Sequence, residues 1–327
     1  MHQNMLQHLS SHTFYMQDFD MRSEEMSLLD KFLCSSEALS QVQHIVVTMK
    51  AGVAPHERRG KPHNGPAKAL HKTVDNTQKV LAMVMDFIAA SQSLQSITLD
   101  NIALEGDLLV RFGNSLSAME GGACKSLILS NCVLGNVGLR SLTPHVNRLL
   151  SLALNALTLE GCGLTDESLV YLGSIVRAGE AHMDQLYWNA TLRMDDDEGD
   201  SYGGIGSRRP GDDSPDSRDR ELGSVYYSGL IALDVNHNAF TCKSMPALGR
   251  LLKSNHWLLA LNLRNNAIEA QGLDVVLDNL QENGALEIIL VGGNPGFTRS
   301  IACEMQTANR RDGEGVNLRA GGVPAAM

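Results

Sequence analysis

Hydrophobic residues recur in one frame along most of the chain. Within each copy, apolar residues occupy positions 1, 4, 6 and 11, and the ninth position usually holds Asn or Cys. The apolar alternation at positions 4 to 6 predicts a short strand with one buried face. Copies of the frame begin at Leu94, Cys124, Leu154, Leu230, Leu258 and Leu286, of which the first and last are the least complete.

A helical pattern follows each strand. In residues 244–255, SMPALGRLLKSN, apolar residues stand at helical spacing. The ninth position falls at 102, 132, 162, 238, 266 and 294, so four of the five steps are 28 or 30 residues long. One strand–helix unit cannot bury its own apolar face, so neighbouring units must stack. The pattern therefore predicts an α/β leucine-rich repeat solenoid, a ribonuclease-inhibitor-like horseshoe with long repeats.

The same frame divides the chain into three parts. Residues 1–38 are expected to be an N-terminal segment with a capping helix over 23–38, and residues 39–299 form the solenoid, with a degenerate first strand in 39–50. Two segments interrupt the solenoid, a basic, Gly- and Pro-rich loop at about 51–72 and an acidic insertion at about 194–222. The insertion has almost no large apolar residue and many charges, so it is expected to be disordered. Residues 300–327 are Gly-rich and are expected to be a flexible tail.

The ninth position has a structural explanation. An Asn there can hydrogen-bond the backbone of adjacent turns, and a Cys fills the same small space with a weak S–H donor. The residues at this position are Cys132, Cys162, Asn238, Asn266 and Asn294. Cys162 lies between two glycines, which would also suit an exposed nucleophile, but an inward position predicts burial and a raised thiol pKa.

The outward positions of the strands predict a binding surface, because solenoids bind partners on the concave face of their sheet. The polar and charged candidates on this face are Asp100, Glu160, Asp234, Asn236, Asn262 and Arg264. Three acids make the face mildly negative, which favours a protein partner with a basic or mixed surface. The alternative is that these side chains are simply solvated.

The composition narrows the classes of partner. The formal net charge is −10, which argues against nucleic acid and anionic membranes as the main partner. No apolar run approaches the roughly 20 residues of a membrane helix, and the first residues lack a signal-peptide pattern. Six cysteines lie far apart without a CxxC pair, so a reduced, intracellular protein is expected.

Motifs for catalysis or metal binding are lacking in the sequence. It contains no P-loop, no GxSxG, no HExxH and no GxGxxG after a strand. A calcium loop counted from Asp195 fails, because Gly199 and Asp200 occupy the fifth and sixth places where the motif needs Asp or Asn and then Gly. His237 and His256 lie near the repeat strands, where a metal-binding pair is conceivable, but an exposed or loop-side position in an irregular repeat is the favoured explanation of each. We therefore expect a protein that is not an enzyme and that binds no cofactor or metal.

Several stretches resemble the centrosomal protein of 78 kDa family over about residues 39 to 299. They include "LSQVQHIVVTMK" followed by the basic loop, the paired repeats "LILSNCVLG" and "LTLEGCGLTDESL", and the "GLIALDVNHN" strand. The most specific is the long helix ending "HMDQLYWNATLR", with Trp188 and Arg193, placed between two repeats. Trp257 then precedes a repeat, and Asn294-Pro295 closes the last one.

The resemblance implies a non-enzymatic protein–protein interaction scaffold at centrioles and basal bodies. It implies a role in centrosome function and cilium assembly, partners among centrosomal proteins and control of a ubiquitin ligase. The expected location is the cytoplasm and cytoskeleton, at the centrosome, centriole or cilium basal body. Two departures from the family are the acidic insertion after Arg193 and the end of the chain at Met327, where the family has a long tail.

Two alternatives stay open. A leucine-rich repeat regulator could act on an enzyme through the concave face, as a GTPase activator or an inhibitor. Trp188 and Arg193 could anchor a partner or lock the long helix onto the solenoid, and the locking role is favoured because a Trp at a repeat boundary usually packs.

Overall fold

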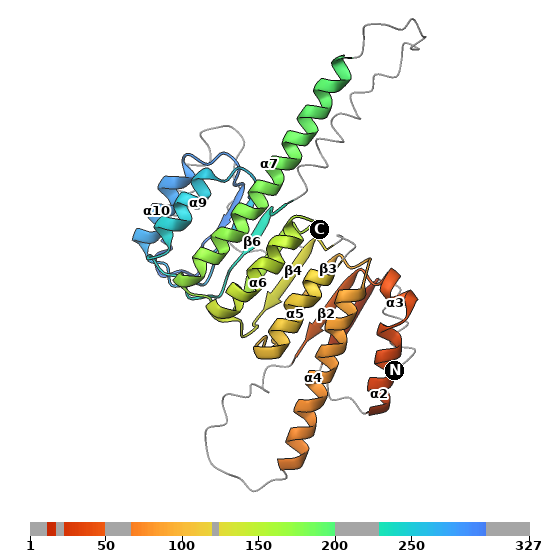
Figure 1. Ribbon diagram of the computed structural model, residues 1–327. Coiled ribbons are helices and arrows are strands. Elements are labelled where there is room, and N and C mark those ends of the chain that lie inside the picture. The colour runs from red at the N-terminus through yellow and green to blue at the C-terminus, as the bar shows by residue number, and fades with distance from the viewer. Residues whose placement is uncertain (1–11, 18–22, 50–66, 120–123, 200–228, 299–327) are drawn as a thin grey trace, which may run out of the picture.

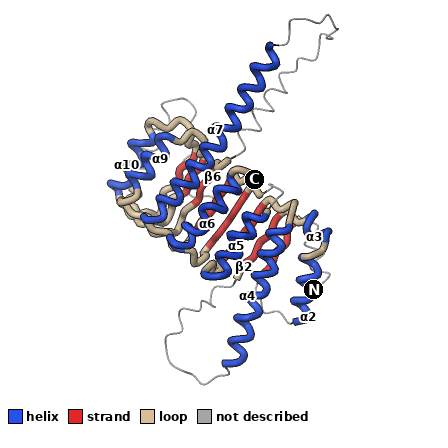
Figure 2. The backbone as a smooth tube through the Cα atoms, viewed as in Figure 1, coloured by secondary structure: helices blue, strands red, loops and turns tan. Residues whose placement is uncertain are grey.

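The chain builds one parallel sheet covered by helices on one side (Figures 1 and 2). The computed structural model describes residues 12–17, 23–49, 67–119, 124–199 and 229–298. Eight strands follow one another in sequence order. They are β1 Thr13–Gln17, β2 His44–Thr48, β3 Ser96–Asp100, β4 Ser126–Ser130, β5 Ala156–Glu160, β6 Ala232–Asp234, β7 Ala260–Asn262 and β8 Ile288–Leu290.

Helices alternate with these strands, as the right-handed crossover of parallel β-structure requires. They are α2 Ser23–Leu33, α3 Ser36–Gln41, α4 Ala67–Ala90, α5 Gly106–Ala118, α6 Gly135–Leu150, α7 Leu169–Gly199, α9 Met245–Ser254 and α10 Ala270–Leu280, with a short 3₁₀ turn over Asp166–Ser168. Figure 2 shows the helices side by side in one layer and the strands in the other. An α/β arrangement in which a single parallel sheet grows unit by unit is therefore observed.

The core lies between the two layers. The five-residue strands β2 to β5 alternate partly exposed and buried side chains. Leu127 and Leu129 are fully buried, and Leu157 and Leu159 are 1% exposed. Because the strands pair without a register shift, for example Leu127 with Leu157, equivalent leucines stack directly along the sheet. The apolar positions of the frame are thus the ones that face the helices.

The N-terminal segment contributes a strand that the sequence analysis did not predict. β1 pairs in parallel with β2, and its Phe14 and Met16 are buried. Phe14 stacks on Phe32 with 5.7 Å between ring centroids. The helix expected over residues 23–38 is divided into α2 and α3, because Ser35 caps α3 by accepting a hydrogen bond from the Ala38 amide at 3.2 Å.

The asparagines at the ninth position tie neighbouring repeats together. The Asn266 amide group donates to the carbonyls of Val235 and Leu263, at 3.2 and 3.0 Å. Its Oδ1 accepts from the amide of Phe240 in the preceding repeat at 3.1 Å. Asn238 and Asn294 repeat this arrangement.

The cysteines at the same position make only the donor half of that pattern. The Cys162 thiol donates to the carbonyls of Leu129 and Glu160, at 3.3 and 3.4 Å. The repeat that follows Leu134 carries Cys162 and not Asn, so it offers no side-chain oxygen to the Leu134 amide. This amide donates instead to the carbonyl of Cys132, in the same repeat, at 2.8 Å. The smaller thiol is accommodated by this change in the turn.

The residue just before the ninth position turns the chain out of its strand. Each of these residues has a left-handed φ, between 52° and 78°: Asn101, Asn131, Gly161, His237, Asn265 and Gly293. Asn and Gly are the residues that adopt this conformation at least cost. Gly161 has a second reason, since a Cβ there would lie 2.7 Å from Asn131 Oδ1.

The insertion leaves the sheet uninterrupted. β5 pairs directly with β6, with Ala156 opposite Ala232. On the helix side, Asp166 accepts two hydrogen bonds from Thr241, from its amide at 2.8 Å and its hydroxyl at 2.6 Å. Partial burial raises the pKa of Asp166, but these hydrogen bonds outweigh burial and hold the pKa below its usual value. The repeats on the two sides of the insertion therefore form one stack.

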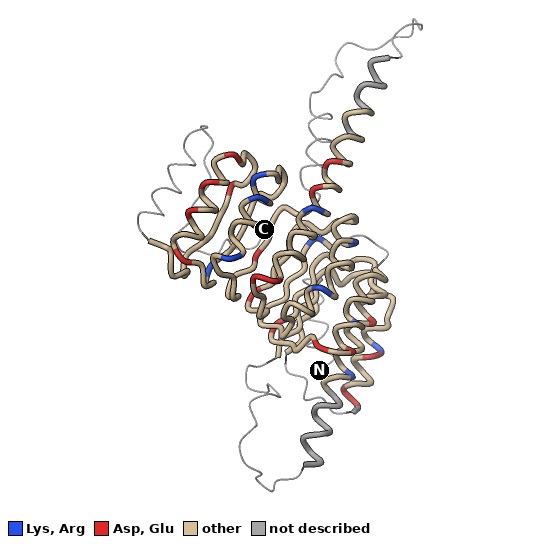
Figure 3. Tube along the Cα trace, turned by 60° about the vertical axis from the view of Figure 1, so that its left-hand side comes forward, with Lys and Arg blue, Asp and Glu red and all other residues tan. Residues whose placement is uncertain are grey.

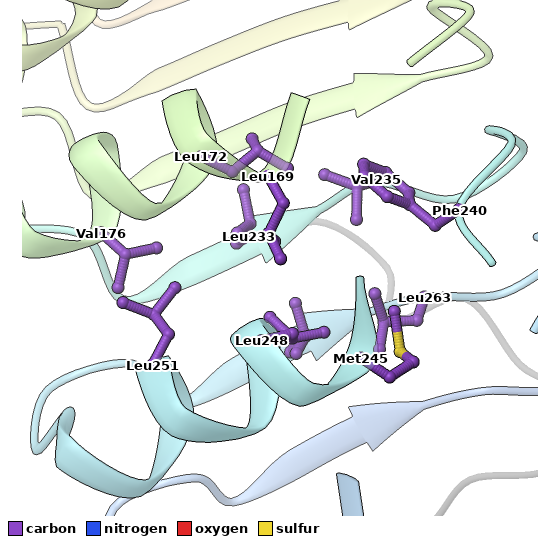
Figure 4. A pocket seen from close by; sticks show the side chains of 11 residues that line it. Leu169, Leu172, Val176, Leu233, Val235, Phe240, Met245, Leu248, Leu251 and Leu263 are labelled. Carbon is purple, nitrogen blue, oxygen red and sulfur yellow. The ribbon is translucent and has the colours of Figure 1, made fainter. Parts of the chain in front are cut away.

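A small cavity of about 10 Å³ marks that junction (Figure 4). It lies between α7, β6 and α9, and Figure 4 shows their apolar side chains converging on it. Its lining is Leu169, Leu172, Val176, Leu233, Val235, Phe240, Met245, Leu248, Leu251, Leu261 and Leu263. A space of this size and character is at the lower limit for one water and offers no polar partner, so it is a packing gap and not a ligand site.

Other expectations fall partly outside the described residues. α4 begins at Ala67, inside the predicted basic loop, and the rest of that loop, residues 51–66, is not described. α7 continues to Gly199, so the first residues of the predicted disordered insertion are helical. Residues 200–222 and the tail at 300–327 lie outside the described residues.

Candidate protein-binding surfaces

The first candidate surface is the open face, which we define as the strand side chains that point away from the helices. Strand register places Thr98, Ile128, Thr158, Asp234, Asn262 and Leu290 in one row across β3 to β8. Register and the repeat frame place Asp100, Ser130, Glu160, Asn236, Arg264 and Gly292 in a second row. Apart from Asn236, all of these residues are partly exposed.

Asp234 is the centre of a polar network on this face. Its carboxylate accepts hydrogen bonds from the Asn236 amide at 2.9 Å and from Asn262 Nδ2 at 2.8 Å. Asn262 Oδ1 in turn accepts from the Arg264 amide at 3.1 Å. The sequence predicts Asn236 on the binding surface, but the structure buries it at 6% exposure. Its side chain also donates to Asp234, at 2.6 Å, so Asn236 holds the network and does not face a partner.

The other two acids of the face lie on different strands, Asp100 on β3 and Glu160 on β5, and each has its own partner. Glu160 Oε1 is 3.4 Å from the Nδ1 of His237, which is exposed at the strand end of the next repeat. Asp100 accepts a hydrogen bond from Asn131 Nδ2 at 3.1 Å. Among the six residues predicted for this face, only Arg264 is a fixed cation. The open face therefore presents separated carboxylates along a polar surface, which fits a protein partner better than a small anionic ligand.

The second candidate surface is the part of α7 that leaves the repeats. Figure 1 shows this helix projecting beyond its neighbours, and Figure 3 shows acidic residues near the base of the projecting part. The helix remains packed as far as Met183, which is 1% exposed. A Cβ on Gly229 would meet the Met183 side chain at 2.5 Å, so the chain returns from the insertion directly against this turn of the helix.

Trp257 extends the packing by one further turn. Its indole Nε1 donates to Asp184 Oδ1 at 2.7 Å, and its ring lies 6.1 Å from that of Tyr187 in a tilted arrangement. Burial and the neighbouring Asp184 carboxylate raise the pKa of Glu180 one turn earlier. The repeat pattern does not identify Asp184 and Tyr187 as partners of Trp257. Their spacing along one helix face was visible, but the loop that they contact could not be identified without the fold.

The expectation that Trp188 locks α7 onto the solenoid is wrong. Trp188 is 62% exposed, and Leu192, one turn later, is 47% exposed. Tyr187 makes the packing contact that was assigned to Trp188. For Arg193 the structure describes only the helical backbone, so its role as an anchor stays a prediction.

The chemical alternatives find no support in the described residues. Burial raises the pKa of the Cys132 and Cys162 thiols to about 12, which keeps both protonated and unreactive at neutral pH. Within the described ranges, no three His, Cys, Asp or Glu side chains are placed to hold a metal ion. The helices of the same ranges include none with the length and hydropathy needed to cross a bilayer.

Comparisons with known proteins give distant matches. No family model matches the chain. The chain is 24% identical over 209 residues to Centrosomal protein of 78 kDa from Mus musculus, and the match covers 62% of this chain and 23% of that protein. The chain thus spans about a quarter of the length of this relative. Among solved structures, Leiomodin-1 Actin-Binding Site 2 aligns with 12% identity, a TM-score of 0.32 and coverage of 68% of this chain and 84% of the other.

Proposed function

We propose that this chain is a leucine-rich repeat solenoid that acts as a non-enzymatic, protein-binding scaffold at the centrosome. The observation that carries the proposal is the 24% identity to a centrosomal protein over 209 residues. The aligned length is enough to include most of the repeats. An assembly role also agrees with the extended face that the paired strands of one sheet present.

For the architecture of the repeats, we propose a ribonuclease-inhibitor-like horseshoe. Repeats of 28 to 30 residues, helices on one face only and the Asn ladder of Asn238, Asn266 and Asn294 support it. In such a solenoid the open face is the concave surface. Its separated carboxylates at Asp100, Glu160 and Asp234 favour a partner with basic or mixed charge.

Imaging tests the location. The full chain with a fluorescent tag is expected to form puncta that overlap a centriole marker, at centrosomes and at the bases of cilia. A diffuse cytosolic signal would contradict the centrosomal proposal. As a matched control, the same tag on a Leu233→Ala variant, whose core is disrupted, reports how far the puncta depend on the folded solenoid.

A test of the open face should leave the fold intact. Asp234→Lys is unsuitable, because Asp234 holds Asn236 and Asn262 in place. Thr158→Lys and Glu160→Lys change partly exposed positions of the face. Loss of partners from both variants in proximity labelling, with retained thermal stability, is the expected result. An unchanged set of partners would remove the open face from the proposal.

The most specific part of the proposal is that the protein controls a ubiquitin ligase during cilium assembly. Proximity labelling with the full chain, beside a version that lacks residues 194–222, tests it. We expect a ubiquitin ligase subunit among the labelled proteins in the full chain. Its absence from both samples would contradict this part and leave the scaffold proposal standing.

A further inference from the structure

An apolar stripe lies on the projecting part of α7. Trp188 and Leu192 are four residues apart, so they lie on the same face of the helix, and they are 62% and 47% exposed. Isolated apolar side chains on a surface need no explanation, but a Trp exposed to this extent beside a second large apolar side chain marks an interaction site. Trp is also among the residues that contribute most to binding at protein interfaces.

The stripe is held in a fixed orientation before any partner binds. Met183 is buried, and Trp257 contacts Asp184 and Tyr187, which stand one turn and one residue before Trp188. The turn that carries Trp188 thus follows directly on a turn fixed by packing. A preorganised surface loses little conformational entropy on binding, which favours affinity.

The charge of this part of the chain decides what can bind. In the part of α7 whose side chains are described, Glu180 and Asp184 precede Trp188 at the same four-residue spacing, so two carboxylates lie on the face of the stripe. A partner that covers the stripe must therefore combine apolar side chains with positive charge.

We propose that the Trp188–Leu192 stripe docks a basic amphipathic helix of another protein, with Leu-type side chains on one face and Lys or Arg beside them. This deepens the proposed scaffold role, on which it rests for its biological meaning, by assigning a second surface and a class of partner. The site is separate from the open face, because it lies on the helix that leaves the repeats (Figure 1).

The same charge disfavours two other occupants. A second copy of this chain would bring two acidic helices together, and like charges in close contact are repulsive. An anionic membrane would be repelled for the same reason, since membrane-binding helices carry Lys and Arg on their polar face. A basic helix is the occupant for which both the apolar and the charged parts of the surface are favourable.

The test measures binding of a model helix to the full chain. The probe is an 18-residue peptide of Leu and Lys in an amphipathic pattern, labelled with a fluorophore, and its counterpart has Glu in place of every Lys. We expect the Leu/Lys peptide to bind and the Leu/Glu peptide not to bind, as measured by fluorescence anisotropy. The Trp188→Ala/Leu192→Ala double variant is expected to bind the Leu/Lys peptide at least about tenfold more weakly.

A matched control lies on the same helix. Val170 is 70% exposed, eighteen residues before Trp188 and so about 27 Å away along the helix axis. Val170→Ala should leave binding unchanged, and Trp188→Phe should retain part of it because an aromatic ring remains. Circular dichroism establishes that each variant is folded.

Four results would overturn the proposal. The first is equal binding of the Leu/Lys peptide to the double variant and to the parent chain, and the second is equal binding of the two peptides to the parent chain. The third is self-association of the parent chain that is lost in the double variant. The fourth is binding of the parent chain to phosphatidylserine vesicles that is lost in the double variant. The measurement does not depend on the location in cells. If the peptide test fails but centrosomal puncta form, only the docking inference is wrong. If the peptide binds but no puncta form, only the centrosomal proposal is wrong.

Discussion

Asn266 connects two repeats with a single side chain. Its amide group donates to carbonyls on both sides of the boundary, and its Oδ1 accepts the backbone amide of Phe240. Asn266 is 7% exposed, so water cannot replace these hydrogen bonds. Leaving a buried backbone group without a partner costs about 1 to 3 kcal/mol. Replacing the Asn266 side chain should therefore lower the stability of the protein markedly.

Asn266→Ala is therefore expected to lower the free energy of unfolding by about 3 kcal/mol. Asn266→Cys should cost less, because a thiol in this position still donates to the neighbouring carbonyls, as Cys162 does. Urea titrations measure both. Asn189→Ala, at an exposed site on α7, is the control and should change stability by less than about 0.5 kcal/mol. Equal stability of the Ala variant and the parent chain would show that the ladder is dispensable.

Cysteine labelling tests the assignment of the thiols. Cys34 is exposed, whereas Cys124, Cys132 and Cys162 are buried with thiol pKa values of about 12. A maleimide should modify Cys34 in the folded protein and the three buried cysteines only in urea, as read by peptide mass spectrometry. Raising the pH from 7 to 9 should not expose them to reaction, because 9 is still far below their pKa. Fast labelling of Cys162 in the folded protein would restore the reactive thiol as an explanation.

At the scale of the elements, α7 has two parts. The part up to Met183 packs on the stack, and Trp257 from another repeat contacts the part beyond it. The hydrogen bond from Trp257 to the exposed Asp184 carboxylate adds little net stability, because water competes for both groups. The aromatic pair with Tyr187 adds about 0.5 to 1.5 kcal/mol. The stability of the projecting helix is therefore local and separable from that of the core.

Trp257→Ala should increase amide hydrogen exchange over residues 184–192 on the order of fivefold, which corresponds to the loss of about 1 kcal/mol of local stability. Trp257→Phe should have a smaller effect, because it keeps a ring beside Tyr187 and removes only the Nε1 hydrogen bond to Asp184. The amides of α6 are the internal control and should not change. If exchange near Tyr187 is the same in all three proteins, Trp257 does not hold the helix.

Features that depend on residues close together in the sequence could be predicted, and features that depend on contacts between distant residues could not. The frame around Leu127, Leu129 and Cys132 is local and repeated, so it predicted strand, register and burial together. β1 was missed because "TFYMQ" occurs once and is recognisable as a strand only beside β2.

The candidate surfaces depended on contacts that a repeat frame does not encode. It placed Asn236 outward, whereas the hydrogen bonds to Asp234 turn it into the structure. It also gave no means to decide between Tyr187 and Trp188, adjacent residues of which only the first faces Trp257.

At the scale of the whole molecule, the long insertion between β5 and β6 is an outgrowth of a continuous stack. Gly179 and Met183 on α7 contact Leu230 and Gly229, where the chain returns. The two ends of the insertion are thus adjacent, and the sheet and the Asp166–Thr241 hydrogen bonds pass beside it without a break. The fold does not require the residues that lie between these ends.

Replacing residues 188–226 by a six-residue Gly/Ser linker should therefore give a chain that folds. Loop closure becomes easier by about 0.6 kcal/mol for each halving of the loop length, so we expect a free energy of unfolding equal to that of the parent chain or about 1 to 2 kcal/mol higher. A longer excision of residues 184–226 also removes the contacts of Asp184 and Tyr187 with Trp257, and should be the less stable of the two.

Urea titration measures the free energy of unfolding of the excised chains, and circular dichroism shows whether they are folded. The peptide-binding assay can also be applied to the chain that lacks residues 188–226. The chain lacking 188–226 has lost Trp188 and Leu192, so it should be folded and unable to bind the Leu/Lys peptide. Unfolding of the excised chain would mean that the insertion stabilises the junction at the small cavity between α7 and α9. A folded excised chain that still binds the peptide would place the binding site outside the Trp188–Leu192 stripe.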